Sequence, residues 1–77
     1  MKTEILLFGQ LEELTGQKRL SMEGFSDTAS LIEALHKQYP VLAQSKYVVA
    51  LDQQIVTENK TLTTDSVVAL LPPFSGG

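Results

Sequence analysis

Two apolar runs near opposite ends of the chain constrain the fold more than any other feature. Ile5–Phe8 and Val67–Leu71 are apolar at every position, without the polar alternation of a strand that has one wet face. Strands that are apolar on both faces belong in the middle of a sheet. The two runs therefore predict neighbouring central strands, and the long chain between them suits a parallel pair.

The remaining strands are shorter and more polar. Residues 18–22 alternate polar and apolar side chains, which is typical of an edge strand with one solvated face. Residues 47–51 and 54–56 are separated by Asp52-Gln53, and this pattern predicts a hairpin with a two-residue turn.

One main helix is expected between the second and third strands, from about residue 29 to 39. Asp27-Thr28 can cap its start, although Ser30 and a glutamate three residues later also have capping-box spacing, which would shift the start by two residues. Pro40 ends the helix, because the residue before a proline is driven out of the α region. Residues 10–15 predict a further short helical turn.

The order strand, strand, helix, strand, strand, strand indicates an α+β protein with two layers, in which the main helix covers one face of a mixed sheet. With the first and last strands paired in parallel, this is the β-grasp, or ubiquitin-like, architecture. At 77 residues the chain is expected to form a single domain over residues 1–77.

The two central strands carry more apolar side chains than such a domain can bury. A single main helix covers one face of the sheet, yet both strands are apolar on both faces. An unpartnered apolar face on a small domain is typical of a protein–protein interface. Loops that cover the face, or a homodimer, are the alternatives, and alternation alone does not tell which set of side chains points outward.

The last six residues, Pro72 to Gly77, read as a tail. Neither proline can continue a central strand, and the terminal glycines are free of side chains. Residues 75–77 are therefore expected to form a slim, flexible thread that can enter a narrow channel and present the carboxylate of Gly77. An ordinary frayed terminus is the alternative.

Composition and net charge argue against several classes of function. The net charge of −3 argues against a nucleic-acid partner, and the absence of cysteine excludes disulfides and thiolate sites from this sequence. His36, the one histidine, is expected to be structural or at the surface, and no metal site or stably bound cofactor is expected. No signal-peptide layout or membrane-length apolar run is present, so a cytoplasmic protein without a membrane partner is predicted.

Three segments together carry a family resemblance: Ile5–Gly16, Tyr47–Gln53 and Val67–Gly77. They resemble the small subunits of molybdopterin synthase, which are ubiquitin-like sulfur carriers. Related carriers of the thiamine pathway share the fold and Gly-Gly, but usually lack the Pro-Pro. Two positions depart from the family pattern: Glu12 replaces a residue that is often basic, and Asp52 one that is often asparagine.

The resemblance implies a cycle in which the chain is a carried substrate and a non-catalytic subunit. An E1-like adenylyltransferase, using ATP and magnesium, joins the Gly77 carboxylate to AMP. A sulfur donor protein then converts the adenylate to a thiocarboxylate. The carrier docks on the large subunit of a heterotetrameric synthase, which supplies the catalytic side chains. There the sulfur passes to cyclic pyranopterin monophosphate and builds the dithiolene of molybdopterin.

The resemblance also implies which residues act. The docking surface would comprise Leu6, Phe8, Leu71 and Phe74, and the segment in the partner's channel would comprise Pro73, Phe74, Ser75, Gly76 and Gly77. Three other functions stay open: a sulfur carrier for thiamine, cysteine or tRNA thiolation, a modifier joined through Gly77 to lysines, and a plain interaction module.

Overall fold

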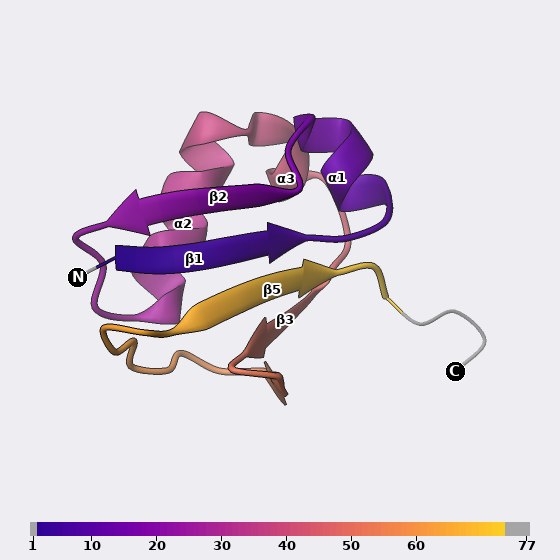
Figure 1. Cartoon of the computed structure of the whole chain (residues 1–77). Helices are drawn as coiled ribbons and strands as arrows, with labels where there is room; N and C mark the ends of the chain where they lie inside the picture. The colour runs from indigo at the N-terminus through magenta and orange to yellow at the C-terminus, as the bar shows by residue number, and fades with distance from the viewer. Residues whose placement is uncertain (1, 74–77) are drawn as a thin grey trace.

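The computed structural model describes residues 2–73 as one five-stranded sheet with helices (Figure 1). The strands lie in the order β2-β1-β5-β3-β4. They are β1 (Lys2–Leu7), β2 (Arg19–Glu23), β3 (Val48–Leu51), β4 (Gln54–Val56) and β5 (Val67–Leu71). The helices are α1 (Gln10–Thr15), α2 (Thr28–Gln38) and α3 (Pro40–Ala43). Within residues 2–73, none of the helices has the length and apolar character needed to cross a bilayer.

The two apolar runs form the centre of the sheet, as predicted. β1 and β5 pair in parallel, with Leu6 opposite Ala69, and each has a further strand on its other side. Alternate side chains of both strands enter the core, where four are at most 2% exposed: Ile5, Leu7, Val68 and Leu70. Burial of such side chains is the main force that holds a domain of this size together.

The bounds of β1 differ from the expected Ile5–Phe8. The strand begins at Lys2, because Lys2 and the two residues after it pair with β2. It ends at Leu7, and Phe8 lies just beyond it, although the Phe8 N–H still donates to the Leu70 carbonyl at 3.2 Å. Gly9, with a φ of 57°, then turns the chain into α1. A positive φ of this kind favours glycine.

The outer strands also follow the sequence pattern. β2 is an edge strand antiparallel to β1, and Leu20 and Met22 pack against the core while the residues between and beside them are exposed. β3 and β4 form the expected hairpin. Its turn residues, Asp52 and Gln53, have φ angles of 48° and 72°, which matches the two-residue turn that suits the twist of a hairpin.

α2 lies across the inner face of the sheet and begins where Asp27 caps it. The Asp27 carboxylate accepts a hydrogen bond from the Ser30 N–H at 2.9 Å, so the alternative start at Ser30 is wrong. Leu31 and Leu35 face the core and are fully buried. The helix ends at Gln38, close to the expected end.

α3 is an element that the sequence prediction missed. Pro40 does stop α2, but it also occupies the first turn of a second short helix, in which Leu42 is fully buried. Proline is favoured at this position because its fixed φ suits a helix and its missing N–H would have no helical partner there. The prediction treated Pro40 only as a terminator.

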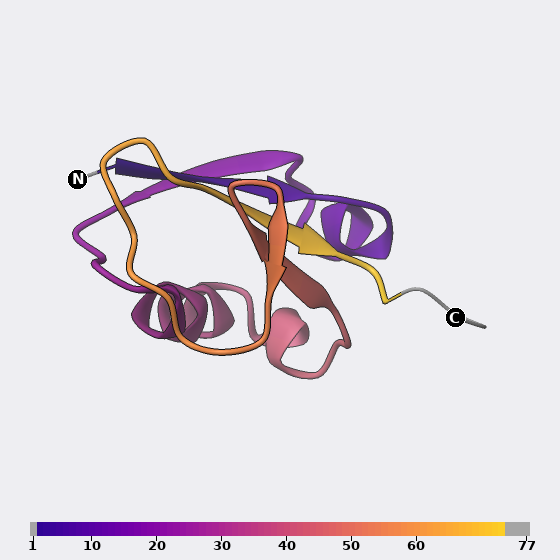
Figure 2. The same ribbon diagram turned by 90° about the horizontal axis from the view of Figure 1, so that it is seen from below.

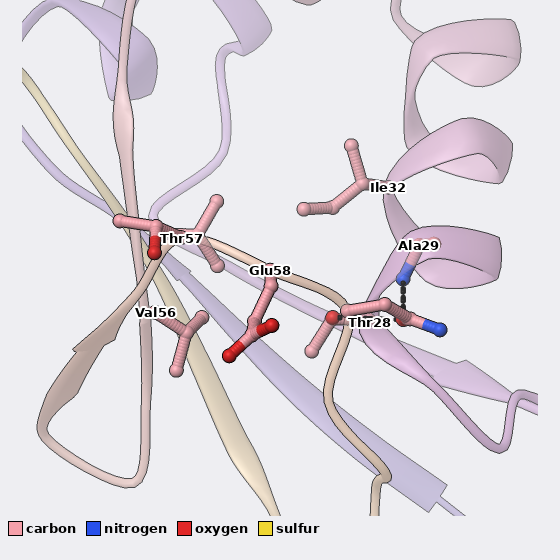
Figure 3. A pocket seen from close by; sticks show the side chains of 8 residues that line it. Thr28, Ala29, Ile32, Val56, Thr57 and Glu58 are labelled. Atoms are coloured by element: carbon pink, nitrogen blue, oxygen red, sulfur yellow. Dashed lines mark hydrogen bonds between the residues drawn. The ribbon is translucent and has the colours of Figure 1, made fainter.

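The loop between β4 and β5 is held against the start of α2. The Asn59 side-chain oxygen accepts from the Ala29 N–H at 2.8 Å and from the Thr28 hydroxyl at 3.2 Å (Figure 3). The Thr28 N–H also donates to the Lys60 carbonyl at 2.9 Å. Figure 3 also shows Ile32 and Val56, which line a small hollow between this loop and the helix.

Thr3 yields a prediction for stability. Its side chain is fully buried in β1, and its hydroxyl has no hydrogen-bond partner among residues 2–73. We expect Thr3→Val to raise the free energy of unfolding by about 1 kcal/mol, because it removes an unsatisfied polar group without emptying the site. Urea denaturation measures this. The matched Thr28→Val removes a hydroxyl that is hydrogen-bonded and should destabilise the fold; equal effects of the two changes would contradict the argument.

Asp27 yields a prediction for acid stability. Hydrogen bonds from Ser30, and then from Asn59, hold the pKa of its carboxyl below the ordinary value. A carboxyl whose pKa is lower in the folded state stabilises the fold above its unfolded pKa of about 4, and this stabilisation is lost as the pH falls through the folded pKa. Asp27→Asn keeps a capping oxygen but does not titrate. We therefore expect the variant to lose less stability between pH 6 and pH 3, and identical losses would contradict this role.

Candidate functional site

The face of the sheet opposite α2 is open. In Figure 2, α2 and α3 lie on one side of the sheet, and in the part of the chain that the structure describes no helix covers the other side. The side chains that alternate with the core residues of β1 and β5 point to this open face. The structure thereby decides what alternation alone left undecided: Leu6, Val67, Ala69 and Leu71 form the outward set.

The open face has a row of side chains that crosses four strands. Leu6 lies opposite Ala69, Ala69 opposite Ala50, and Ala50 opposite Ile55. Ile55 is 56% exposed, and Phe8 beside the end of β1 is 44% exposed. Large apolar side chains therefore stand in solvent on either side of two alanines.

These residues form an apolar hollow of about 590 Å³. It is lined by Leu6, Phe8, Ala50, Asp52, Gln53, Ile55, Val67, Ala69 and Leu71. Beyond the hollow, the open face becomes polar, where Arg19 Nε lies 2.6 Å from Glu4 Oε1. The structure thus brings together Leu6, Phe8 and Leu71, three of the four residues expected in a docking surface. Their role in binding stays a prediction.

The predicted tail begins at the edge of this hollow. β5 ends at Leu71, and Pro72 packs against the bare backbone of Gly9, where an added Cβ would lie 2.7 Å from the proline Cγ. Pro73 is exposed. The other residues assigned to the tail, Phe74, Ser75, Gly76 and Gly77, lie outside the described residues, so the prediction of a flexible thread over residues 75–77 is untested.

Asp52 has a role in the structure that the sequence did not indicate. Its carboxylate accepts from the Val67 N–H at 2.9 Å, and its own N–H donates to the Val67 carbonyl at 2.9 Å. The hairpin turn is thus tied to the first residue of β5. The sequence did predict a turn at this position, and aspartate tolerates the positive φ that the turn requires. No nearby residue in the sequence indicated that Asp52 would bond to Val67. The other departure, Glu12, lies in the first turn of α1, where a carboxylate is favoured by the helix dipole.

The one histidine, His36, takes part in a contact between two elements of the fold. His36 Nε2 hydrogen-bonds to the Tyr47 hydroxyl, and burial raises the pKa of that hydroxyl. The pair connects α2 to the segment that leads into β3, which supports the structural role expected of His36. Within residues 2–73, no cluster of three or more His, Cys, Asp or Glu side chains is placed to hold a metal ion.

Comparison with known proteins identifies the family of the chain. The sequence model of the ThiS family matches residues 5–77. This chain belongs to the ThiS family. The molybdopterin synthase sulfur carrier subunit of Arabidopsis thaliana is 31% identical to this ThiS-family chain over 81 residues, which cover 100% of this chain and 84% of the relative.

Solved structures confirm the β-grasp fold of this ThiS-family chain. A putative molybdopterin converting factor subunit 1 from Pyrococcus furiosus aligns with a TM-score of 0.88 at 19% identity, over 96% of this chain and 99% of that one. The small archaeal modifier protein 1 of Methanosarcina acetivorans aligns with a TM-score of 0.83 at 20% identity, over 99% of this chain and 96% of that one. A complex of subunits 1 and 2 of the molybdopterin-converting factor of Helicobacter pylori contains a chain that aligns with a TM-score of 0.75 at 21% identity, over 100% of both chains.

The two faces of β5 predict opposite outcomes for neighbouring substitutions. Leu70 is fully buried, so Leu70→Asp places a charge in the core and should cost at least about 4 kcal/mol, enough to prevent folding. Leu71 faces the open side, and Leu71→Asp should cost less than about 1 kcal/mol. Circular dichroism during thermal unfolding measures both. An unfolded Leu71→Asp protein would place that side chain in the core.

Proposed function

We propose that this chain is the sulfur carrier subunit of a molybdopterin synthase, and that the carboxylate of Gly77 carries the sulfur as a thiocarboxylate. The observation that carries the proposal is the continuity between an open apolar hollow and the strand that leads into Pro72-Pro73 and Gly-Gly. A protein that docks on the hollow also receives the tail. The whole-chain similarity to the Arabidopsis thaliana sulfur carrier subunit supports this product over those of other pathways.

Loading of the carrier begins at the carboxylate of Gly77. A carboxylate is a poor electrophile, so a partner adenylyltransferase uses ATP and magnesium to join it to AMP, and pyrophosphate leaves. Sulfur from a donor protein, at the oxidation level of sulfide, then attacks the acyl carbon and displaces AMP. Covalent activation of this kind divides one difficult step into two easier ones.

Transfer takes place on a second protein, the large subunit of the synthase. The open face of the carrier docks, and residues 73–77 enter the active-site channel. The thiocarboxylate sulfur then attacks a carbon of the cyclic pyranopterin monophosphate, where a C–S bond forms as a C–O bond breaks and the oxygen substituent leaves. Water then cleaves the acyl–sulfur bond, which restores the Gly77 carboxylate and leaves the sulfur on the pterin. Because a dithiolene holds two sulfur atoms, each product molecule consumes two loaded carriers. The Helicobacter pylori complex of subunits 1 and 2 supports a partner of this kind.

A protein modifier is the second candidate function. The Methanosarcina acetivorans neighbour is named a modifier protein, and its fold matches this chain over nearly its whole length. In that role the Gly77 carboxylate would form an isopeptide bond with lysine side chains of other proteins. Mass spectrometry of trypsin-digested cell proteins distinguishes the two functions, because a modified lysine would carry residues 61–77, which follow the last basic residue, Lys60.

The tail yields a prediction for loading. We expect deletion of Gly77, a C-terminal extension beyond it, and Gly76→Val each to eliminate thiocarboxylate formation while thermal unfolding stays unchanged. A carboxylate oxygen of Gly77 must reach the ATP α-phosphate in a confined channel, where errors of about 1 Å already slow a reaction. Intact-mass spectrometry detects the replacement of one oxygen by sulfur.

The control for these variants is Thr57→Val, which introduces the same side chain at an exposed position away from the hollow. It should load normally. If an extended protein that is not trimmed still supports molybdopterin synthesis at the normal rate, Gly77 is not the site of sulfur transfer and the proposed function is wrong.

A further inference from the structure

The floor of the hollow is built from the smallest side chains on the open face. Ala50 and Ala69 face one another across β3 and β5, and Leu6 and Ile55 flank them in the same row. Ala50 is only 5% exposed, whereas Ile55 at the rim is 56% exposed. Ala69 is partly buried. A floor of two small side chains beneath an exposed apolar rim is a depression into which an apolar group can fit.

Such a depression suits one bulky side chain better than a flat contact. Protein interiors and interface centres are packed to a similar density, so an interface that left this depression empty would lose dispersion contacts along its whole lining. Interfaces gain most of their binding energy from a few large side chains that fill pockets near the centre.

We propose that the protein that receives the tail inserts one bulky apolar side chain, aromatic or leucine-like, onto the Ala50–Ala69 floor. This inserted group fixes the register of docking and therefore the depth to which the tail enters the partner's channel. The inference rests on the proposed function, and it specifies the chemistry by which the partner recognises the carrier.

The reach of the tail selects that partner as the occupant. Leu71 lines the hollow, and Gly77, whose carboxylate reacts in the proposed function, is four residues beyond Pro73. Four extended residues span at most about 14 Å. A protein that holds Gly77 in its active site therefore contacts the surface around Pro73, next to the Leu71 end of the hollow.

A second copy of the chain fits the hollow less well. Each copy carries a net charge of −3, so two copies repel one another, and Asp52 adds a carboxylate at the end of the hollow. Self-association is therefore one of the outcomes that the test distinguishes.

The experiment fills the hollow from this side of the interface. Ala69→Leu, Ala69→Val and Ala69→Ser form a series in which the new side chain occupies most, part or little of the depression. The probe is the large subunit of molybdopterin synthase encoded in the same genome, and isothermal titration calorimetry measures its Kd. We expect Ala69→Leu to raise Kd about 30-fold or more, as the loss of a central anchor does, with a smaller rise for Ala69→Val and little change for Ala69→Ser.

The control is Ser21→Leu, which adds a leucine to the polar part of the same face, opposite Glu4 and outside the hollow. It should leave Kd unchanged. Thermal unfolding of every variant shows that the fold is kept. If Ala69→Leu does not fold, the valine variant carries the test, because valine is favoured in strands.

Three outcomes would overturn the inference. If Ala69→Leu binds normally while Leu71→Asp does not, the partner uses the rim and leaves the floor empty, and the proposed function stands. If the native protein forms a dimer that Ala69→Leu disrupts in sedimentation equilibrium, a second copy is the occupant. If the native protein does not bind the large subunit at all, the proposed function fails together with the inference.

Discussion

The parallel pairing of β1 with β5 is the interaction on which the rest of the structure depends. It joins segments from the two ends of the chain, so every element between them must fold back over the same sheet. One set of alternate side chains from the two strands forms the centre of the core, and the other set forms the hollow. The pairing also places Gly9, where β1 has ended, beside Pro72, where the tail begins. One face of this strand pair thus forms the core, and the other face forms the candidate site.

What the sequence predicted correctly depended on local signals. The central strands, the Asp27 cap and the Asp52-Gln53 turn each follow from side chains within a few residues of one another. The missing features are either very short or non-local. α3 has only four residues, and Asp52 bonds to a residue fifteen positions away. Which alternate side chains of β1 and β5 point outward depends on the side of the sheet that α2 covers. An alternation pattern in the sequence carries no information on that side.

The candidate site could be predicted in part, and for a physical reason. An excess of apolar side chains over the faces available to bury them is visible in any sequence, and here it indicated an interface. The alanine floor was not visible, because its depth arises only when strands distant in the sequence place Ala50 beside Ala69. A small side chain in a strand has no distinctive pattern until its neighbours across the sheet are known.

The direction of the central strands has a practical consequence for handling the protein. β1 starts at Lys2 at one end of the sheet, and β5 runs parallel to it and finishes at the opposite end (Figure 1). A strand of six residues extends about 20 Å. An affinity handle or fluorescent dye attached ahead of Lys2 is therefore separated from the hollow's Phe8 and Leu71 end by roughly the length of the sheet. The same group on the other terminus is joined to the end of β5 that adjoins the hollow. The fold therefore indicates that the protein can be immobilised through the N-terminal end, ahead of Lys2, with the hollow left accessible.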